Sequence, residues 1–272
     1  MILSVSSYWP LSSTHPRVFK RLNSYAHSIN FDHEGTLLTF HDHSRIASPM
    51  SIRLTLNETD LQQIFSTIHE VTLRAQGLCL DTVCYPWSLC PTTMHQLPLT
   101  SALTPSQQHT LQARVAQALH AYPPQEIEAS SLHSRIEQLH HALLGEGSLE
   151  RAVEALIGAG PGLTPTGDDV LLGVLVGLNY QQNERLLDHY KRILKPRVLK
   201  PNATVWLSQQ FLAFALEGWV IEPLVTLIDS LQLDQDIDSI IDTLRTLGHS
   251  SGQDVLQGLW LAISTGGNTY DS

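Results

Sequence analysis

The sequence lacks the positive charge that a nucleic-acid-binding protein needs. It has 16 lysines and arginines against 26 aspartates and glutamates, which gives a formal net charge of −10. A surface for phosphate backbones requires clustered basic residues, and no such cluster stands out from this background. We therefore expect no nucleic-acid partner. Any anionic ligand must be held locally, by backbone amides or a few placed cations.

Long uninterrupted apolar runs are also missing. The most apolar stretch of the second half, residues 211–228, is broken by Glu217 and Pro223, whereas a helix that spans a bilayer needs about 20 apolar residues. Residues 1–5 lack the basic start and long apolar stretch of a signal peptide. We expect a cytoplasmic protein that makes no contact with a membrane.

Cysteine is scarce, with three residues at positions 79, 84 and 90. Their number is odd, and the spacing is not the Cys-x-x-Cys pattern of zinc sites. Cys79, Cys84 and Cys90 are therefore expected to be small buried apolar residues with free thiols in a reducing compartment.

The first hundred residues show mostly short extended patterns separated by turn signals. Alternating or β-branched stretches predict strands at 25–31, 35–41, 50–56 and 78–85. One helix interrupts them, because Thr59 and Gln62 can form a capping box before an apolar stripe that ends at Gly77.

The helical period dominates from Thr104 onward, where Pro105 suits the first helical position. Further apolar stripes predict helices after residue 130, from Ser148, and around 237–247. The sequence thus predicts an α+β fold. Residues 1–103 form a β-rich N-terminal region with one helix, and residues 104–272 form a mainly α-helical region. Tyr122-Pro123-Pro124 is an alternative boundary.

The densest motif is Gly-Pro-Gly-Leu-Thr-Pro-Thr-Gly-Asp-Asp-Val-Leu-Leu-Gly at residues 160–173. Its glycines and prolines predict a tightly shaped loop that leads into a helix. Thr164 or Thr166 suits the N-cap, since a hydroxyl there can accept from a free amide. Asp168 and Asp169 then lie near the positive end of the helix dipole.

The same design recurs 85 positions later. Residues 166–173 align without gaps to residues 251–258, and the shared pattern is hydroxyl-Gly-x-Asp-Val-Leu-x-Gly. We infer that the two loop-helix motifs pack as a pair with their N-termini side by side. The candidate catalytic residues are Asp168, Asp169, His249 and Asp254. The candidate substrate-binding residues are Gly160, Gly162, Thr164, Thr166, Gly167, Ser250, Ser251 and Gly252.

The residue types at these motifs leave the ligand open. Free amides at a helix start suit a phosphate or carboxylate, but aspartates repel an anion. They could orient the loop, hold a divalent cation such as Mg²⁺, or accept N–H groups from an amide or carbamoyl substrate. His249 could act as acid or base near neutral pH. Either motif alone could also be no more than a helix cap and a packing contact.

A weaker signal is His41-Asp42-His43, which would place two histidines on one face of a continuing strand. No third ligand for a metal is evident, so an exposed strand end is the expected interpretation.

The two motifs resemble the signatures of the AllH-type family, formerly a domain of unknown function. Residues 160–173 are similar to its Gly-Pro-Gly-Leu-Thr-Pro-Ser-x-Asp-Asp signature, with Thr166 where serine is common. Residues 247–258 are similar to its Leu-Gly-His-[Ser/Thr]-Ser-Gly-x-Asp-x-Leu-x-Gly signature. Looser similarity continues through residues 29–40 and 49–52.

This resemblance implies one of three subunits of oxamate carbamoyltransferase, which interconverts oxalurate plus phosphate with oxamate plus carbamoyl phosphate in allantoin degradation. The implied partners are an FdrA-like protein and an AllG-type protein. The implied ligands are small anions with amide N–H groups. Two alternatives stay open: a non-catalytic scaffold subunit, and a stand-alone metal-dependent enzyme that uses Asp168, Asp169 and Asp254.

Overall fold

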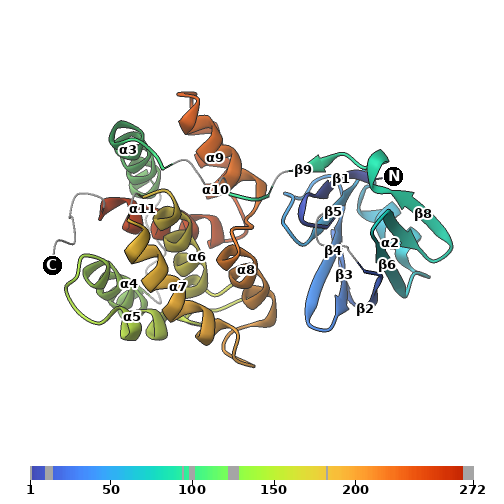
Figure 1. The fold of residues 1–272 in the computed structure, drawn as a ribbon, viewed down its shortest axis with the longest axis horizontal. Helices are drawn as coiled ribbons and strands as arrows, with labels where there is room; N and C mark the ends of the chain where they lie inside the picture. The colour runs from blue at the N-terminus through green and yellow to red at the C-terminus, as the bar shows by residue number, and fades with distance from the viewer. Residues whose placement is uncertain are drawn as a thin grey trace. The chain divides into compact units, whose positions relative to one another are not determined.

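The computed structural model describes residues 2–9, 15–93, 95–97, 102–121, 129–181 and 183–265. The chain divides into two compact units (Figure 1): Met1–Leu97 with Trp219–Val225, and Pro98–Gly218 with Thr226–Ser272. Strands dominate the first unit and helices the second, which confirms the predicted α+β class. The alternative boundary at Tyr122-Pro123-Pro124 lies outside the described residues.

The first unit is built on a nine-stranded sheet in the order β8-β7-β6-β2-β3-β4-β5-β1-β9. The β4–β5 and β1–β9 pairs are parallel, and the other neighbours are antiparallel. The strands are β1 (Ile2–Ser6), β2 (Arg17–Tyr25), β3 (Ser28–His33), β4 (Thr36–His41), β5 (Ser51–Leu54), β6 (Glu70–Arg74), β7 (Gly77–Leu80), β8 (Val83–Pro86) and β9 (Thr92–Thr93).

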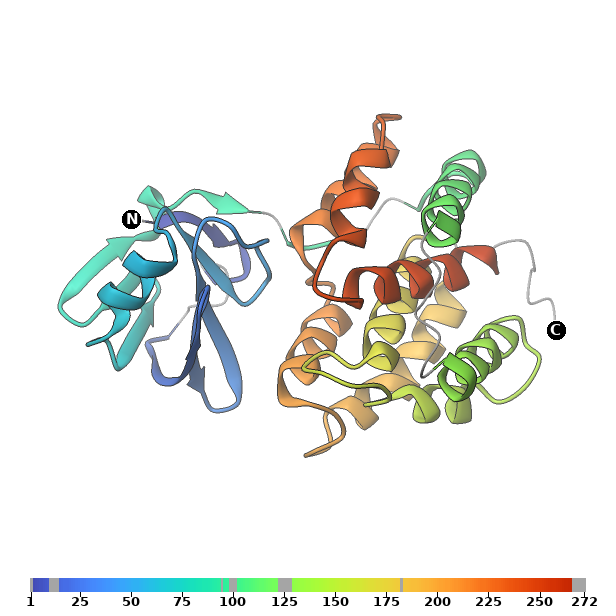
Figure 2. The ribbon, with the colours of Figure 1, turned by 180° about the vertical axis from the view of Figure 1, so that it is seen from behind.

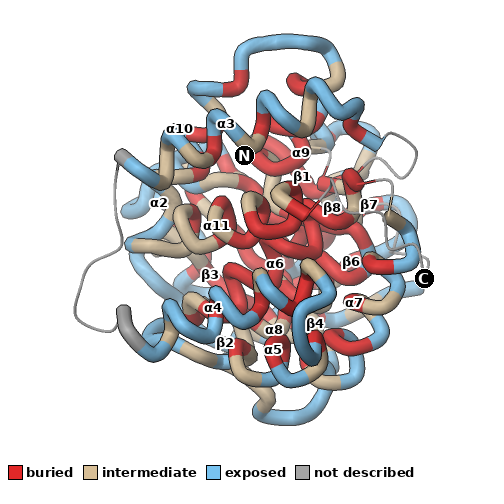
Figure 3. The backbone as a smooth tube through the Cα atoms, turned by 90° about the vertical axis from the view of Figure 1, so that its left-hand side faces the viewer, coloured by how far each residue is buried: buried red, intermediate tan, exposed pale blue. Residues whose placement is uncertain are grey.

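One face of this sheet carries the apolar core of the unit, together with helix α2 (Glu58–Phe65). Alternate residues of a strand point to opposite faces, so Phe31 and Phe40 lie on the same side and their rings pack edge to face. Leu61 and Phe65 bury the apolar stripe of α2 in this core. The buried residues of both units are coloured red in Figure 3.

The predicted helix from Thr59 to Gly77 is too long. It ends at Phe65, and β6 takes over at Glu70. Its N-cap is Asn57, whose side chain accepts from the amide of Asp60, so the predicted capping box of Thr59 and Gln62 is wrong. The cap lies two residues earlier than predicted, so Thr59 is already inside the first turn of the helix.

The predicted strand at 25–31 is also wrong, because a turn after Tyr25 splits it between β2 and β3. The strands predicted at 35–41 and 50–56 are confirmed as β4 and β5. The stretch at 78–85 forms the β7–β8 hairpin.

The cysteine prediction is corrected at the same hairpin. Cys79 and Cys84 are cross-strand partners and form a disulfide, whereas Cys90 is a buried free thiol. Register brings two side chains of an antiparallel pair within bonding reach. Sequence spacing alone does not show this, and the free-thiol prediction holds only for Cys90.

The second unit is a helical assembly around α6 and α11. Its helices are α3 (Pro105–Ala121), α4 (Ala129–Leu143), α5 (Leu149–Leu156), α6 (Thr166–Asn179), α7 (Glu184–Val198), α8 (Trp206–Leu216), α9 (Glu222–Gln232), α10 (Asp238–Arg245) and α11 (Ser251–Ser264). The predicted starts are confirmed at Pro105 and after Ser148, whose hydroxyl accepts from the amide of Arg151.

Helix α6 lies at the centre of this unit. It is apolar nearly all round and buried from Gly167 to Leu178, as a helix surrounded by others must be. Helix α11 packs directly against it, and the two are drawn in yellow and red in Figure 2. The two motifs begin these two helices. No helix among the described residues is long and apolar enough to cross a membrane.

Candidate functional site

The two motifs start their helices in register. Helix α6 begins at Thr166 and α11 at the aligned Ser251. The residues before them, Pro165 and Ser250, are the N-caps, and neither makes a side-chain capping bond. The prediction that Thr164 or Thr166 is the N-cap is therefore wrong, because both threonine hydroxyls bond to groups of the other motif.

The helices approach each other through two equivalent glycines. A Cβ atom on Gly173 would lie 2.1 Å from the carbonyl oxygen of Val255. A Cβ atom on Gly258 would lie 2.0 Å from the carbonyl oxygen of Val170. These four residues occupy aligned positions of the repeat, so each half makes the same contact with the other. The predicted packing of the motifs as a pair is confirmed, and its arrangement is two-fold.

Asp169 is bound by hydroxyls of both motifs. The hydroxyls of Thr164, in its own loop, and Ser251, in the other motif, both hydrogen-bond with its carboxyl group. The two hydroxyls also contact each other, with 2.7 Å between Thr164 Oγ1 and Ser251 Oγ. The start of α11 thus contributes directly to the surroundings of an α6 carboxyl group.

Asp254 has the reciprocal surroundings. Thr166 of the other motif and Ser250 of its own turn donate side-chain hydrogen bonds to its carboxyl group. The two aspartates occupy aligned positions of the repeat, as do Thr166 and Ser251. Each carboxyl group therefore receives one hydroxyl from its own motif and one from its partner motif.

Burial changes the ionisation of this pair. Asp169 is 7% exposed, and desolvation raises its pKa to about 8, with the negative charges of Asp254 and Asp168 acting in the same direction. The hydrogen bonds from Ser251 and Thr164 oppose this rise. Burial also raises the pKa of Asp254. At neutral pH Asp169 is therefore a neutral acid that can donate a hydrogen bond.

Each of these carboxyl groups keeps one oxygen without a partner. The Oδ2 atoms of Asp169 and Asp254 are buried and make no hydrogen bond within the described structure. Leaving such an atom unpaired costs about 1–3 kcal/mol. A buried polar atom without a partner calls for an explanation, such as an ion, a water or a catalytic role.

Asp168, although adjacent in sequence, has different surroundings. Its Oδ1 accepts from the amide of Gly158 at 2.9 Å, and its Oδ2 accepts from the hydroxyls of Ser208, at 2.6 Å, and Thr204. The carboxylate ties the loop before α6 to the start of α8. Thr204 and Ser208 were not predicted, because they lie some 40 residues away and follow no motif.

The remaining predicted residues form the loops around the carboxyl pair. Gly167 and Gly252 pass close to the carbonyls of the preceding helices, with virtual Cβ distances of 2.0 Å to Leu156 and 1.6 Å to Leu244. Gly160 has φ +111°, which only glycine adopts readily. Gly162 has φ +92° in the exposed part of the loop. His249 is exposed in the turn before α11.

Two surface pockets of the helical unit, of about 300 and 330 Å³, lie near α4, α5 and the start of α7. None of the residues that line them belongs to either motif. We place the candidate site at the motifs, because the buried carboxyl pair there carries chemistry.

The residues that could hold a divalent cation are Asp169 and Asp254. Carboxylate oxygens are the ligands that Mg²⁺ prefers. Within the described part of the chain, no group of three or more histidine, cysteine, aspartate or glutamate side chains is arranged to hold a metal.

Residues 156–263 match the family described as oxamate carbamoyltransferase subunit AllH. The matched range contains both motifs and the helix pair that they begin. No solved structure matches the chain. The resemblance predicted from the two motifs is confirmed over this range. The description of the family is that of one subunit of an enzyme.

Proposed function

We propose that this chain, as an AllH-type subunit, helps an oxamate carbamoyltransferase convert oxalurate and phosphate to oxamate and carbamoyl phosphate in allantoin and purine nitrogen catabolism. The family match supports the enzyme class. The observation that supports a ligand site at the motifs is the pair of buried carboxyl groups, Asp169 and Asp254. Each is bound by hydroxyls of both motifs. We further propose FdrA-like and AllG-type partner subunits.

The reaction needs donors and acceptors close together. An oxygen of hydrogen phosphate attacks the carbamoyl carbon of oxalurate, and the bond from that carbon to the oxamate nitrogen breaks. The proton of the hydrogen phosphate passes to this nitrogen, which becomes the amide of oxamate. Substrate carbonyl and carboxylate oxygens need donors throughout, and the substrate N–H groups need acceptors.

The paired motifs supply both kinds of group. A neutral Asp169 donates to a substrate oxygen, so the two aspartates need not repel an anion. Asp254 accepts a substrate N–H through its unpaired Oδ2. Both belong to the proposed catalytic set, with His249 as the exposed acid or base. Asp168 positions the loop and α8.

The proposed substrate-binding residues all lie in the two motifs. Hydroxyls and free amides at the start of a helix suit an anion, because the helix dipole favours negative charge there. The proposed residues are Gly160, Gly162, Thr164, Thr166, Gly167, Ser250, Ser251 and Gly252.

Reconstitution tests the assignment. The chain is expressed with FdrA-like and AllG-type proteins, supplied with oxalurate and phosphate, and assayed for carbamoyl phosphate and oxamate. We expect transfer by the full complex and none when this chain is omitted. Equal transfer without the chain would contradict the assignment. Activity that EDTA abolishes and Mg²⁺ restores would show that the assembled complex needs a divalent cation.

A further inference from the structure

A row of polar side chains crosses the sheet of the first unit on the face opposite its apolar core. Arg53 of β5 is the register partner of both Ser4 of β1 and His41 of β4. Register partners point to the same face of a sheet, and the next residue of each strand points to the other. The neighbouring register positions all belong to the apolar core: Val5, Phe40 and Ile52.

Every member of this row has a buried polar atom without a hydrogen-bond partner. These atoms are Ser4 Oγ, Arg53 Nε and His41 Nδ1. His95, which follows β9, adds a fourth in its Nε2. His95 lies near enough to Arg53 for the guanidinium to contribute to its lowered pKa. Four unpaired polar atoms in one place are costly to keep, at about 1–3 kcal/mol each.

The two histidines of this row each have a ring nitrogen that can accept a hydrogen bond. Burial, with a contribution from Arg45, lowers the pKa of His41 to about 4, and the carbonyl of His27 favours a proton on its other ring nitrogen. The Nδ1 of His95 lies 3.1 Å from the carbonyl of Val220 and donates to it, and burial lowers the pKa of His95 to about 4. Both rings are therefore neutral at pH 7. The unpaired nitrogen of each ring has no proton, so its lone pair can accept a hydrogen bond from a ligand.

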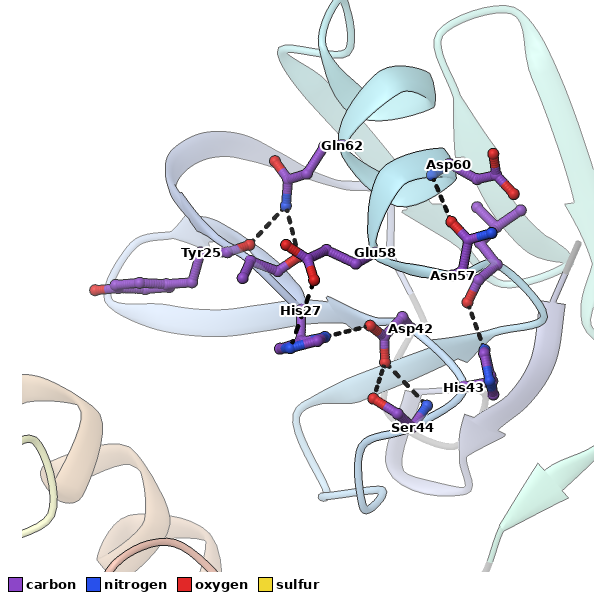
Figure 4. Close-up of polar contacts among 11 residues, drawn as sticks. Tyr25, His27, Asp42, His43, Ser44, Asn57, Glu58, Asp60 and Gln62 are labelled. Carbon is purple, nitrogen blue, oxygen red and sulfur yellow. Dashed lines mark hydrogen bonds and ion pairs between the residues drawn. The ribbon is translucent and has the colours of Figure 1, made fainter.

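Arg53 and Ser4 present donors beside these acceptors. The carboxylates near the row leave Arg53 Nε unpaired. Asp42 accepts from His27 at 2.6 Å and from Ser44 at 2.5 Å, as Figure 4 shows. Glu222 forms an ion pair with Nη1 of Arg53, at 3.9 Å, and this contact does not involve Nε. The side chain of Arg53 is 23% exposed, so this member of the row extends to solvent.

We propose that Ser4, Arg53, His41 and His95 form a second binding site, for a small carboxylate that also carries an N–H group. The carboxylate accepts from Arg53 Nε and the Ser4 hydroxyl, and the N–H group donates to a histidine nitrogen. A simple anion would satisfy the donors and leave both lone pairs unpaired. This site lies in the first unit and does not depend on the motifs of the second.

Histidine resonances provide the test. The full-length chain, labelled with ¹⁵N-histidine, is titrated with oxamate, which has both a carboxylate and an amide, and separately with acetate and acetamide. We expect saturable shifts of the ring nitrogens of His41 and His95 with oxamate, at a Kd at least about tenfold below that for either fragment. Absence of saturable shifts, or equal binding of acetate, would overturn the proposal.

Matched variants locate the site. Arg53→Leu and the milder Ser4→Ala should each weaken oxamate binding by about tenfold or more, with an unchanged melting curve showing that the variant is folded. His43→Gln serves as the control, since His43 bonds the carbonyl of Leu56 outside the row. Asp169→Ala should leave these shifts in place, which separates this site from the motif site. Shifts that survive Arg53→Leu would refute the assignment.

Discussion

At the residue scale, the two adjacent aspartates of the first motif have opposite roles. Successive residues of a helix point in directions about a quarter-turn apart, so Asp168 faces α8 whereas Asp169 faces α11. The sequence could identify both as unusual but could not separate them. Their partners, Ser208 and Ser251, lie 40 and 82 positions further along the chain.

The raised pKa of Asp169 predicts a pH-dependent stability. The native state keeps this proton up to a pKa of about 8, whereas the unfolded chain loses it near pH 4. The contribution of this proton to the free energy of unfolding is fully present below pH 4 and is lost as the pH rises to about 8. The free energy of unfolding falls by no more than about 1.4 kcal/mol per pH unit in this range. Asp169→Asn should flatten this slope in urea unfolding between pH 5 and 8.

The exposed Asp242 provides the matched comparison for that measurement, because its carboxylate pairs with Arg245 on the surface of α10. Asp242→Asn should keep the slope of the parent chain. If Asp169→Asn and Asp242→Asn give the same slope, Asp169 does not hold a proton in the native state.

The contacts of Asp168 predict a loss of stability when its side chain is removed. Asp168→Ala removes the acceptor of the Gly158 amide and of the hydroxyls of Thr204 and Ser208. Losing a buried network of this kind costs about 2–4 kcal/mol. Chemical denaturation should show this loss, and a variant within 0.5 kcal/mol of the parent, roughly the range of surface substitutions, would contradict the positioning role.

At the element scale, the contact of α6 with α11 explains why glycine recurs at the same place in both helices. An alanine in a helix interior is ordinarily about 1 kcal/mol better than glycine. Here the added Cβ of Gly173→Ala would meet the backbone of Val255. Overpacking costs about 1–3 kcal/mol.

Gly173→Ala and Gly258→Ala should therefore both lower the unfolding free energy, by similar amounts because the contact is reciprocal. Ser239→Ala, at an exposed position of α10, controls for helix propensity and should have little effect. The measurement is the shift of the denaturation midpoint. A gain in stability from either glycine variant would show that the helices do not meet there.

Elements were predictable where the signal was local. The proline start at Pro105, the cap at Ser148 and the eight-residue repeat are all short-range patterns, and the structure confirms the helices that they begin. The helix predicted to Gly77 failed for a physical reason. Ile68 and Val71 continue the spacing of buried residues after Phe65, but they pack into the same core from a loop and a strand. Periodicity alone does not distinguish these cases.

At the scale of the whole molecule, the same eight-residue repeat lies in the range that matches the family, begins the two packed helices and supplies the carboxyl pair. Each motif supplies a carboxyl group, a hydroxyl to the other carboxyl group, and a glycine to the shared interface. The sequence predicted this pairing because the repeat itself is visible. It did not predict the polar row around Arg53, since the register of β1, β4 and β5 depends on pairing between distant segments.

The central claim is that the carboxyl pair belongs to the catalytic site of the assembled transferase. Its most direct test is the rate of oxalurate phosphorolysis by the reconstituted complex carrying Asp169→Ala and Asp254→Ala, beside Asp242→Ala as control. With assembly verified by size-exclusion chromatography, we predict a loss of at least about 100-fold for the double variant, as for removal of groups that stabilise a transition state. The control should keep its rate. A double variant that assembles and reacts at a rate within about twofold of the parent would contradict the claim, because that rate is far higher than the removal of such groups allows.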